Sequence, residues 1–563
     1  MNSLSAPLRR RALNCRSFPA LALAPVKGLP NCRGRGISTQ ELDATKGDRE
    51  RIVILGSGWS GFTISRQLNP KKYQVVVISP RSYFVFTPLL ASTAVGTLEF
   101  RNTLESVRSK TSDVKFYQGW ADDVNFAEKF ISVEENAIGR PKTPEEGRGK
   151  LMEKKKVKGK IFDVRYDKLV VAVGCYSQTF GTRGVRENAL FLKDIRDARK
   201  IRTRVLECFE TAALPTTSDE LRKQLLNFAI VGGGPTGVEF AAELFDLCHE
   251  DLQRMYPSLL PHVKITIYDV AAKILPMFDK NLADYALEHF RRDGIAIKTE
   301  HHIQSLVKGL PGIKQGEEAG GCTLTTKEDG EVGVGMCVWS TGLMMNPFIE
   351  KALSDVHQYP GGSAVLSAGE GAEKEKPEDR HWILKRHEKT GGLIVDSHFR
   401  VKLVSSPHPP PSTKSTHQSL DSTSVAAAPS SNSAEATMRD VFALGDVTVM
   451  EKARLPATAQ VANQEAKWLG RMLNKGETGE GEGFTFRNMG VMTYLGGMRA
   501  IMQTGGEGEI KGLVDLERCI SDANDQLEEQ TFDTYVLVRL FLSLLVLFTL
   551  RSGMDGRLVS GMK

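Results

Sequence analysis

Two segments of the chain share one pattern of apolar and polar positions. Each begins with a short apolar run of strand-forming residues, 51–55 and 227–231, turns on glycines, and continues as a helix former. A second apolar run, 74–78 in one unit and 263–269 in the other, supplies the next strand. Strand, helix and parallel strand make up the repeating unit of an α/β fold. The pattern therefore predicts an α/β protein with two Rossmann-type dinucleotide-binding domains.

The turns of both units have the G-x-G-x-x-G spacing. The first copy contains Gly56, Gly58 and Gly61, and the second contains Gly232, Gly234 and Gly237. The first glycine of such a loop allows the tight turn, the second lets the backbone approach a pyrophosphate, and the third lets helix and strand pack closely. One copy alone is a weak signal. Two independent copies predict two bound dinucleotides.

The residues at the ends of the second strands differ between the two units. In the second unit Asp269 ends the strand, where a carboxylate can accept both ribose hydroxyls of NADH and would repel the 2′-phosphate of NADPH. A solvated strand-end acid is the alternative interpretation of Asp269. In the first unit the strand ends in Ser79-Pro80-Arg81 and lacks this acid. NADH is therefore predicted for the second unit only.

The positive charge is concentrated at the N-terminus. The chain of 563 residues has a formal charge of +6, and seven Arg and Lys residues precede its first acid, Glu41. Without them the remainder carries about −1, which gives no argument for binding nucleic acid. An acid-free segment with Arg and Ser is typical of a mitochondrial transit peptide, here over residues 1–40 and ending near 35–39. A disordered basic arm is the alternative.

The eight cysteines show no C-x-x-C motif and no short-range pairing. This argues against a redox dithiol, a zinc ribbon and a disulfide framework, so most are expected to be small buried residues. No metal site is evident. No EF-hand loop is present, so calcium control is not predicted.

Four segments carry a resemblance to a known family. They are Ser79-Pro-Arg-Ser-Tyr-Phe-Val-Phe-Thr-Pro-Leu-Leu90, Gly-Pro-Thr-Gly-Val-Glu239, Phe-Ala-Leu-Gly-Asp446 and Leu455-Pro-Ala-Thr-Ala-Gln-Val-Ala-Asn-Gln-Glu-Ala466. Together they resemble the type II, rotenone-insensitive NADH:ubiquinone oxidoreductases of mitochondria, in their fungal and plant form. The resemblance covers about residues 48–510, apart from insertions, and implies the two-dinucleotide-binding flavoprotein fold of the glutathione-reductase type.

The resemblance also implies which residues bind FAD. These are Ser79, Arg81, Thr87, Pro88, Gly174 and Asp446, besides the first glycine loop. Ser79 and Arg81 would lie beside the adenosine, and Thr87 and Pro88 near the flavin. The strand that ends in Gly174 would lie against the flavin, and Asp446 would accept a hydrogen bond from the ribityl chain.

A further set of residues is implied at the nicotinamide and the quinone. It contains Glu239, Gly342, Ala459, Gln460 and Gln464. Glu239 would project toward nicotinamide and flavin, although a glutamate on a first helical turn is also favoured by the helix dipole alone. Ala459 and Gln460 would lie at the flavin and line the quinone pocket. Gln464 shares the helical face of Gln460, and an ordinary polar face is the alternative.

One position departs from the family pattern, and four segments lie outside its motifs. Many members have His where this chain has Asn463, which removes a titratable group. The segments 310–335 and 355–385 are expected to be surface elaborations, and 136–160 a loop insertion. Residues 196–226 are expected to form a helix and a polar linker.

The domain organisation implied by the resemblance is discontinuous. It comprises a FAD domain over 48–225 and 346–480, with a disordered insertion at 405–437, an NADH domain over 226–345, and a membrane-associated region over 481–563. The apolar run 535–550 would span about 24 Å as a helix, short of a hydrocarbon core of about 30 Å. It is expected to be a membrane-associated segment, inserted in one leaflet or barely spanning, and a buried core helix is the alternative. Homodimerisation is left open.

The predicted activity is hydride transfer from NADH to FAD, followed by two-electron reduction of ubiquinone. Two alternatives compete with it. A sulfide:quinone oxidoreductase would need a cysteine relay, for which Cys175 and Cys337 are the only plausible pair. A flavin-binding signalling protein would show only vestigial turnover.

Overall fold

The computed structural model describes most of the chain in several stretches. They are residues 38–108, 113–136, 159–314, 319–353, 357–359, 366–368, 381–405, 434–479, 481–497, 499–503 and 511–515. The chain divides into two compact units, 1–45 and 46–563. In the first unit, helix α1 (Thr39–Ala44) begins after Ser38, whose hydroxyl accepts the backbone N–H of Glu41 in a capping box. The predicted targeting segment lies outside the described residues, apart from 38–40.

The larger sheet is built around the first glycine unit. Strand β1 (Glu50–Leu55) pairs in parallel with β2 (Tyr73–Ser79) and with β8 (Lys168–Val171). Strand β24 (Glu435–Ala443) pairs in parallel with β8, although it lies far along the chain. Because β24 joins the sheet that contains β1, this sheet is built from segments that lie far apart in the sequence. The order along the sheet is β19-β21-β23-β24-β8-β1-β2-β5-β6-β7.

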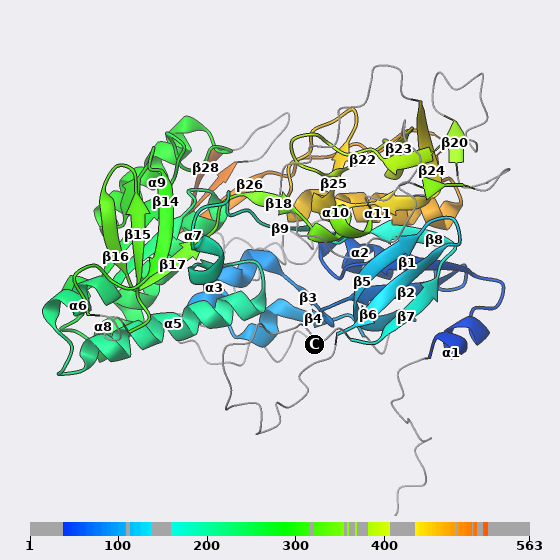
Figure 1. Ribbon diagram of the computed structural model, residues 1–563. Coiled ribbons are helices and arrows are strands. Elements are labelled where there is room, and N and C mark those ends of the chain that lie inside the picture. The colour runs from blue at the N-terminus through cyan, green and yellow to red at the C-terminus, as the bar shows by residue number, and fades with distance from the viewer. Residues whose placement is uncertain are drawn as a thin grey trace, which may run out of the picture. The chain divides into compact units, whose positions relative to one another are not determined.

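The remaining strands of this sheet extend it on both sides. They are β5 (Lys115–Asn125), β6 (Phe130–Glu135), β7 (Ile161–Arg165), β19 (His357–Gln358), β20 (Leu366–Ala368), β21 (His381–Leu384), β22 (Leu393–Val395), β23 (Arg400–Ser405) and β25 (Thr448–Met450). Helix α2 (Trp59–Gln67) follows the glycine turn, and α11 (Ala459–Lys475) packs along it (Figure 1). The helix of the 455–466 motif therefore lies against the helix that follows the first glycine turn.

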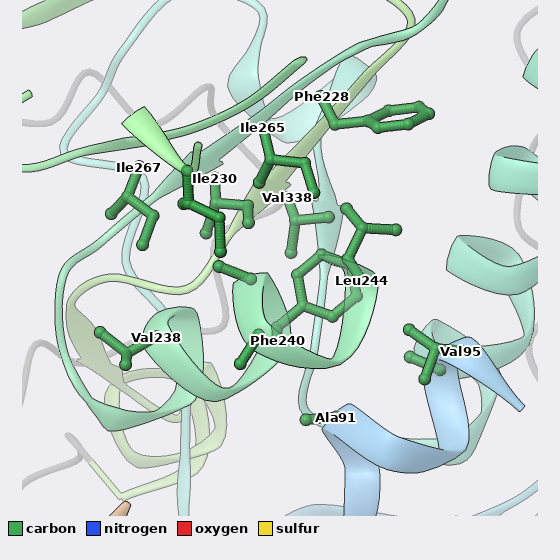
Figure 2. Close-up of a cluster of buried hydrophobic side chains, with 14 of the residues drawn as sticks. Ala91, Val95, Phe228, Ile230, Val238, Phe240, Leu244, Ile265, Ile267 and Val338 are labelled. Atoms are coloured by element: carbon green, nitrogen blue, oxygen red, sulfur yellow. The ribbon is translucent and has the colours of Figure 1, made fainter. Parts of the chain in front are cut away.

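The second sheet has the order β10-β17-β11-β12-β13, with every pairing parallel. Its strands are β10 (Leu190–Phe191), β11 (Asn227–Val231), β12 (Lys264–Tyr268), β13 (Ala296–Lys298) and β17 (Met336–Trp339). Helix α7 (Pro235–Asp246) covers this sheet. Figure 2 shows Val238 and Phe240 of α7 beside Ile230, Ile267 and Val338 of the strands. The two predicted Rossmann-type units are thus present, as the fold class requires.

Helix α7 lies between its own sheet and helix α3. Helix α3 (Leu90–Val95) follows the Thr-Pro-Leu-Leu segment and packs against both α5 (Ile195–Ala213) and α7. Ala91 and Val95 of α3 approach α7 on the side away from the strands (Figure 2). The other helices are α4 (Val185–Asn188), α6 (Asp219–Leu225), α8 (Gln253–Met255), α9 (Lys280–Asp293) and α10 (Pro347–Ala352). Helix α3 therefore belongs to the hydrophobic core of the second sheet.

The expectations for residues 310–335 and 196–226 are wrong in part. Residues 322–334 form strands β15 (Cys322–Thr326) and β16 (Gly330–Val334), which pair with β14 (Ile303–Lys308). Leu324 and Val334 are buried there, because the antiparallel sheet packs on β17 and α4. The predicted polar linker after α5 contains helix α6. The glycines and charged residues of 310–335 concealed the strands, although β14, β15 and β16 follow one another along the chain.

The segment 355–385 and the insertion 405–437 also contribute strands. Strand β19 pairs with β21, and β20 pairs with β24, so the described parts of 355–385 belong to the large sheet. Strand β24 begins at Glu435, so the predicted insertion ends earlier than 437. Residues 406–433 lie outside the described residues, as does most of the expected loop at 136–160.

Several short sheets complete the described fold. Strand β3 (Tyr83–Val85) pairs with β4 (Leu104–Ser106), and β9 (Cys175–Ser177) pairs with β18 (Leu343–Met345). Strands β26 (Val491–Gly496), β27 (Arg499–Gln503) and β28 (Lys511–Asp515) form an antiparallel sheet whose first strand packs on α7. None of the helices in the described ranges has both the length and the apolar character that crossing a bilayer requires. The apolar run 535–550 lies outside those ranges.

Candidate active site

The first glycine turn has the shape of a pyrophosphate cradle. Gly56 has φ +107°, a left-handed value that a residue with a side chain rarely adopts. A Cβ at Gly61 would lie 2.2 Å from the carbonyl oxygen of Gly56, so the close approach of helix and turn requires glycine. A Cβ at Gly58 would meet nothing within 4 Å. The open space above Gly58, at the N-terminus of α2, fits a phosphate group.

The residues predicted beside the adenosine are tied to this turn. The hydroxyls of Ser57 and Ser79 lie 2.9 Å apart, and Ser57 also donates to the carbonyl of Arg81. The guanidinium of Arg81 forms an ion pair with Asp194, with Nη1 and Oδ2 2.7 Å apart. The end of β2 is therefore fixed against the glycine turn and against the start of α5. Asp194 is a partner that the motifs did not single out.

Thr87 and Pro88 form a short 3₁₀ turn that leads into α3. The indole Nε1 of Trp59, the first residue of α2, donates to Thr87 Oγ1 over 2.9 Å. The ring of Trp59 lies edge-on to Phe84 at a centroid distance of 5.0 Å. The segment predicted near the flavin is thereby joined directly to the helix of the first cradle.

Asp446 and Gly174 come together at the carboxyl ends of β24 and β8. Gly174 has φ +67°, and the next residue, Cys175, donates its thiol proton to Asp446 Oδ2 over 3.0 Å. Burial, and then the charge of Asp446, raises the pKa of the Cys175 thiol to about 11, so the thiol keeps its proton at neutral pH. Glu465 of α11 accepts the backbone N–H of Gly445 over 2.6 Å and supports the turn that carries Asp446.

The second glycine turn repeats the geometry of the first. Gly232 has φ +118°, and a Cβ at Gly237 would lie 2.0 Å from the carbonyl oxygen of Gly232. A Cβ at Gly234 would again meet nothing within 4 Å. The N-terminus of α7 therefore offers a second open cradle for phosphates.

Asp269 lies beside the second cradle. One of its carboxylate oxygens accepts the backbone N–H of Gly233, and the other accepts that of Ala271 over 2.7 Å. These bonds hold the carboxylate at the mouth of the glycine turn, where a ribose would lie. Gly342 has φ +68° and ends the chain segment after β17; a Cβ there would lie 2.6 Å from the ring of Phe180. Gly342 and Gly174 each precede one strand of the β9–β18 pair.

The two dinucleotide-binding units meet where α3 touches α7. Ser92 of α3 donates to Glu243 Oε1 over 2.7 Å, and Thr97 donates to Glu243 Oε2 over 3.0 Å. One turn earlier on α7, Glu239 accepts the backbone N–H of Tyr494. Burial, and then the charge of Glu243, raises the pKa of the Glu239 carboxyl to about 8. Glu243 was missed in the sequence, although its i, i+4 spacing from Glu239 was visible.

Gln460 and Gln464 share one face of α11, as predicted, and both bind one extended segment. Gln464 accepts the N–H of Arg487 over 3.1 Å and donates to its carbonyl over 2.8 Å. Gln460 accepts the N–H of Met489 and donates to the carbonyl of Gly490. Ala459 is the first residue of α11, and Asn463 accepts a hydrogen bond from Thr63 of α2. The glutamines thus anchor residues 487–490 beside the first cradle.

Two phosphate cradles, each following a parallel strand of its own sheet, define with the buried side chains that join the two units a flavoprotein that binds two dinucleotides. The match of residues 50–360 to the family of pyridine nucleotide-disulphide oxidoreductases agrees with this class.

Two relatives narrow the family to which the chain belongs. It is 33% identical to a probable NADH dehydrogenase of Dictyostelium discoideum over 81% of each chain. It is 32% identical to the external alternative NAD(P)H-ubiquinone oxidoreductase B1, mitochondrial, of Solanum tuberosum, over 84% of this chain and 85% of that one. The chain belongs to the pyridine nucleotide-disulphide oxidoreductases and, within them, to the alternative, type II NADH:ubiquinone oxidoreductases.

A solved structure shows the same fold. NDH2 of Plasmodium falciparum in complex with NADH matches with a TM-score of 0.59 and 23% identity, over 82% of this chain and 92% of that one. The sulfide:quinone alternative gains no support. Cys337 is buried in β17, and the Cys175 thiol is bonded to Asp446. Both are free cysteines.

Proposed function

We propose that this chain is a single-subunit NADH:ubiquinone oxidoreductase in which FAD occupies the first cradle and NADH the second. The observation that carries the proposal is the direct contact between the two dinucleotide-binding units, through Ser92 of α3 and Glu243 of α7. It brings the Thr-Pro-Leu-Leu segment of the first unit against the helix of the second. A nicotinamide and an isoalloxazine bound at the two units would therefore face each other.

The residues present fit such a pair of cofactors. Gly58 and Gly234 leave open space at two helix N-termini, and the positive φ of Gly56 and Gly232 shapes the turns beneath. FAD, when bound, accepts a hydride from NADH and passes two electrons to the quinone. The overall reaction converts NADH, a proton and a quinone into NAD⁺ and a quinol. The protein contributes position, electrostatics and exclusion of water.

Each predicted side chain has a role in this scheme. Asp269 would accept the ribose hydroxyls of NADH, since its carboxylate is held at the glycine turn by two backbone N–H groups. Asp446 would orient the ribityl chain. Glu239 would lie at the junction, where its raised pKa lets it hold a proton near neutral pH. Gln460 and Gln464 would shape the quinone pocket by holding residues 487–490.

The location follows from the relatives and from the charge of the N-terminus. Relatives in potato and Arabidopsis thaliana are named mitochondrial and external. Together with the basic, acid-free N-terminal segment, this supports a mitochondrial enzyme at the inner membrane. We infer peripheral or monotopic attachment through the C-terminal region. Oxidation of external NADH by intact mitochondria, whose inner membrane excludes the nucleotide, would identify the face.

Two half-reactions test the proposed function. Purified protein should contain one FAD, whose absorbance NADH bleaches under anaerobic conditions and a ubiquinone analogue restores. Sulfide should leave the absorbance unchanged. A folded protein without flavin would refute the proposal. Quinone reduction slower than about 1 s⁻¹ would favour the signalling alternative, since typical enzymes turn over faster.

A further inference from the structure

A lysine that the sequence motifs did not assign lies next to the groups predicted at the flavin. The ammonium Nζ of Lys193 lies 3.1 Å from Cys175 Sγ and 3.4 Å from the carbonyl oxygen of Cys175. The same thiol donates to Asp446 Oδ2 over 3.0 Å. Lys193, Cys175 and Asp446 therefore form a chain of hydrogen bonds at the carboxyl ends of β8 and β24.

The protonation state of Cys175 determines which atom donates in each of these hydrogen bonds. The raised pKa of Cys175, caused first by burial, keeps the thiol protonated, so its hydrogen points to the carboxylate and its sulfur accepts from the ammonium. The thiol thus separates the positive charge of Lys193 from the negative charge of Asp446. Across the described ranges, neither side chain forms an ion pair within 4 Å.

The backbone of Lys193 is held rigidly. Asp197 Oδ2 accepts the N–H of Lys193 over 3.1 Å and the N–H of Asp194 over 3.0 Å, which closes the capping box of α5. Asp194 is in turn bound to Arg81, 2.7 Å away. The backbone of Lys193 is therefore positioned by the same residues that anchor the end of β2.

A partly buried ammonium without a carboxylate partner is costly unless a ligand supplies the negative charge. An ammonium has three donors, and the contacts with Cys175 use two of them. A flavin that accepts a hydride gains negative charge on its ring, and a nearby cation stabilises this charge. Lys193 lies where the ring should be, if Asp446 and Gly174 contact the flavin as proposed above.

We propose that Lys193 supplies the positive charge that faces the flavin ring and thereby raises the reduction potential of the bound cofactor. Cys175 positions the ammonium and keeps it from pairing with Asp446. The inference rests on the proposed function, because it requires FAD in the first cradle. It makes Lys193 a determinant of how readily NADH reduces the enzyme.

The test is the midpoint potential of the purified holoenzyme, measured by spectroelectrochemistry. Lys193→Met removes the charge and keeps the length of the side chain. It should lower the equilibrium constant for two-electron reduction about tenfold, which shifts the midpoint by about −30 mV. Lys193→Arg keeps the charge and should stay near the wild-type value. Lys200→Met removes an exposed lysine of α5 and serves as the matched control.

The outcomes separate this inference from the proposed function. If Lys193→Met binds FAD fully and has the wild-type potential, the inference is wrong while the proposed function stands. Weakened FAD binding with an unchanged potential would mean that Lys193 contacts the phosphates. This result would also overturn the inference. If Lys193→Met does not fold, Lys193→Gln retains N–H donors for Cys175 and should show the same shift. Wild-type protein that folds without flavin would refute the proposed function itself.

Discussion

Glu239 and Glu243 lie one turn apart on α7, and Glu243 is held there by the hydroxyls of Ser92 and Thr97. Burial and the neighbouring charge of Glu243 raise the pKa of Glu239 from 4.5 to about 8. A carboxyl with a raised pKa binds its proton more tightly in the folded state. Its contribution to stability is complete below about pH 4.5 and is lost as the pH rises through about 8.

Glu239→Gln should therefore flatten the pH dependence of stability. Relative to wild type, the variant should gain stability between about pH 5 and 8, by a few kcal/mol at most. Thermal unfolding of both proteins across this range measures the difference. Asp251→Asn, an exposed acid beyond the end of α7, is the control and should follow wild type. Parallel curves for wild type and Glu239→Gln would show that the raised pKa is wrong.

The second prediction concerns the choice of nucleotide. Asp269→Asn removes the charge that would repel the 2′-phosphate of NADPH, and the amide can still accept one of the two backbone N–H bonds. The ratio of kcat/KM for NADPH to that for NADH should rise by about tenfold, corresponding to about 1.4 kcal/mol. An unchanged ratio would mean that Asp269 only supports the turn at Gly233.

The glycines of the second cradle should fall into two kinds. Gly237→Ala places a Cβ 2.0 Å from the carbonyl oxygen of Gly232, so it should cost about 1–3 kcal/mol of stability. Gly234→Ala meets nothing within 4 Å, so the fold should keep its melting temperature while NADH binding weakens. Calorimetry and NADH titration separate the two effects. Normal NADH affinity in Gly234→Ala would place the pyrophosphate elsewhere.

The first cradle offers a matched comparison. Gly61→Ala places a Cβ 2.2 Å from the carbonyl oxygen of Gly56, and it should lower the FAD content of the purified protein. Gly237→Ala should leave the FAD content unchanged. The ratio of flavin to protein absorbance measures this. Loss of FAD in both variants would show that the two cradles do not act independently.

The glutamines of α11 should affect the quinone half-reaction selectively. Gln464→Ala removes both hydrogen bonds to the backbone of Arg487, each contributing about 1 kcal/mol. Residues 487–490 should loosen, and reoxidation of the flavin by quinone should slow. Bleaching by NADH should be unaffected, and Lys467→Ala on the same helix is the control. Equal loss in both half-reactions would contradict a role at the quinone.

The local parts of the site were predictable from the sequence. The two glycine turns, the strands that precede them and Asp269 depend on residue spacing within single βαβ units, where neighbours in sequence are neighbours in space. The same holds for the shared face of Gln460 and Gln464, which helical periodicity determines. The α/β class followed from these units. The residue roles at FAD and quinone came from resemblance and remain predictions.

Contacts between distant segments were decided by tertiary structure. The strands at 322–334 are an exception, because they pair with each other and with the preceding strand β14, and only the frequent glycines and charged residues of 310–335 led to the expectation of a surface elaboration. The role of Glu243 became evident only from the structure, in which Ser92 of α3 donates a hydrogen bond to it. Lys193 lies far from Asp446 in sequence, and only the joining of β8 to β24 places both beside Cys175. Sequence spacing determined each cradle, and long-range packing determined what surrounds it, because burial and charge depend on every segment that folds nearby.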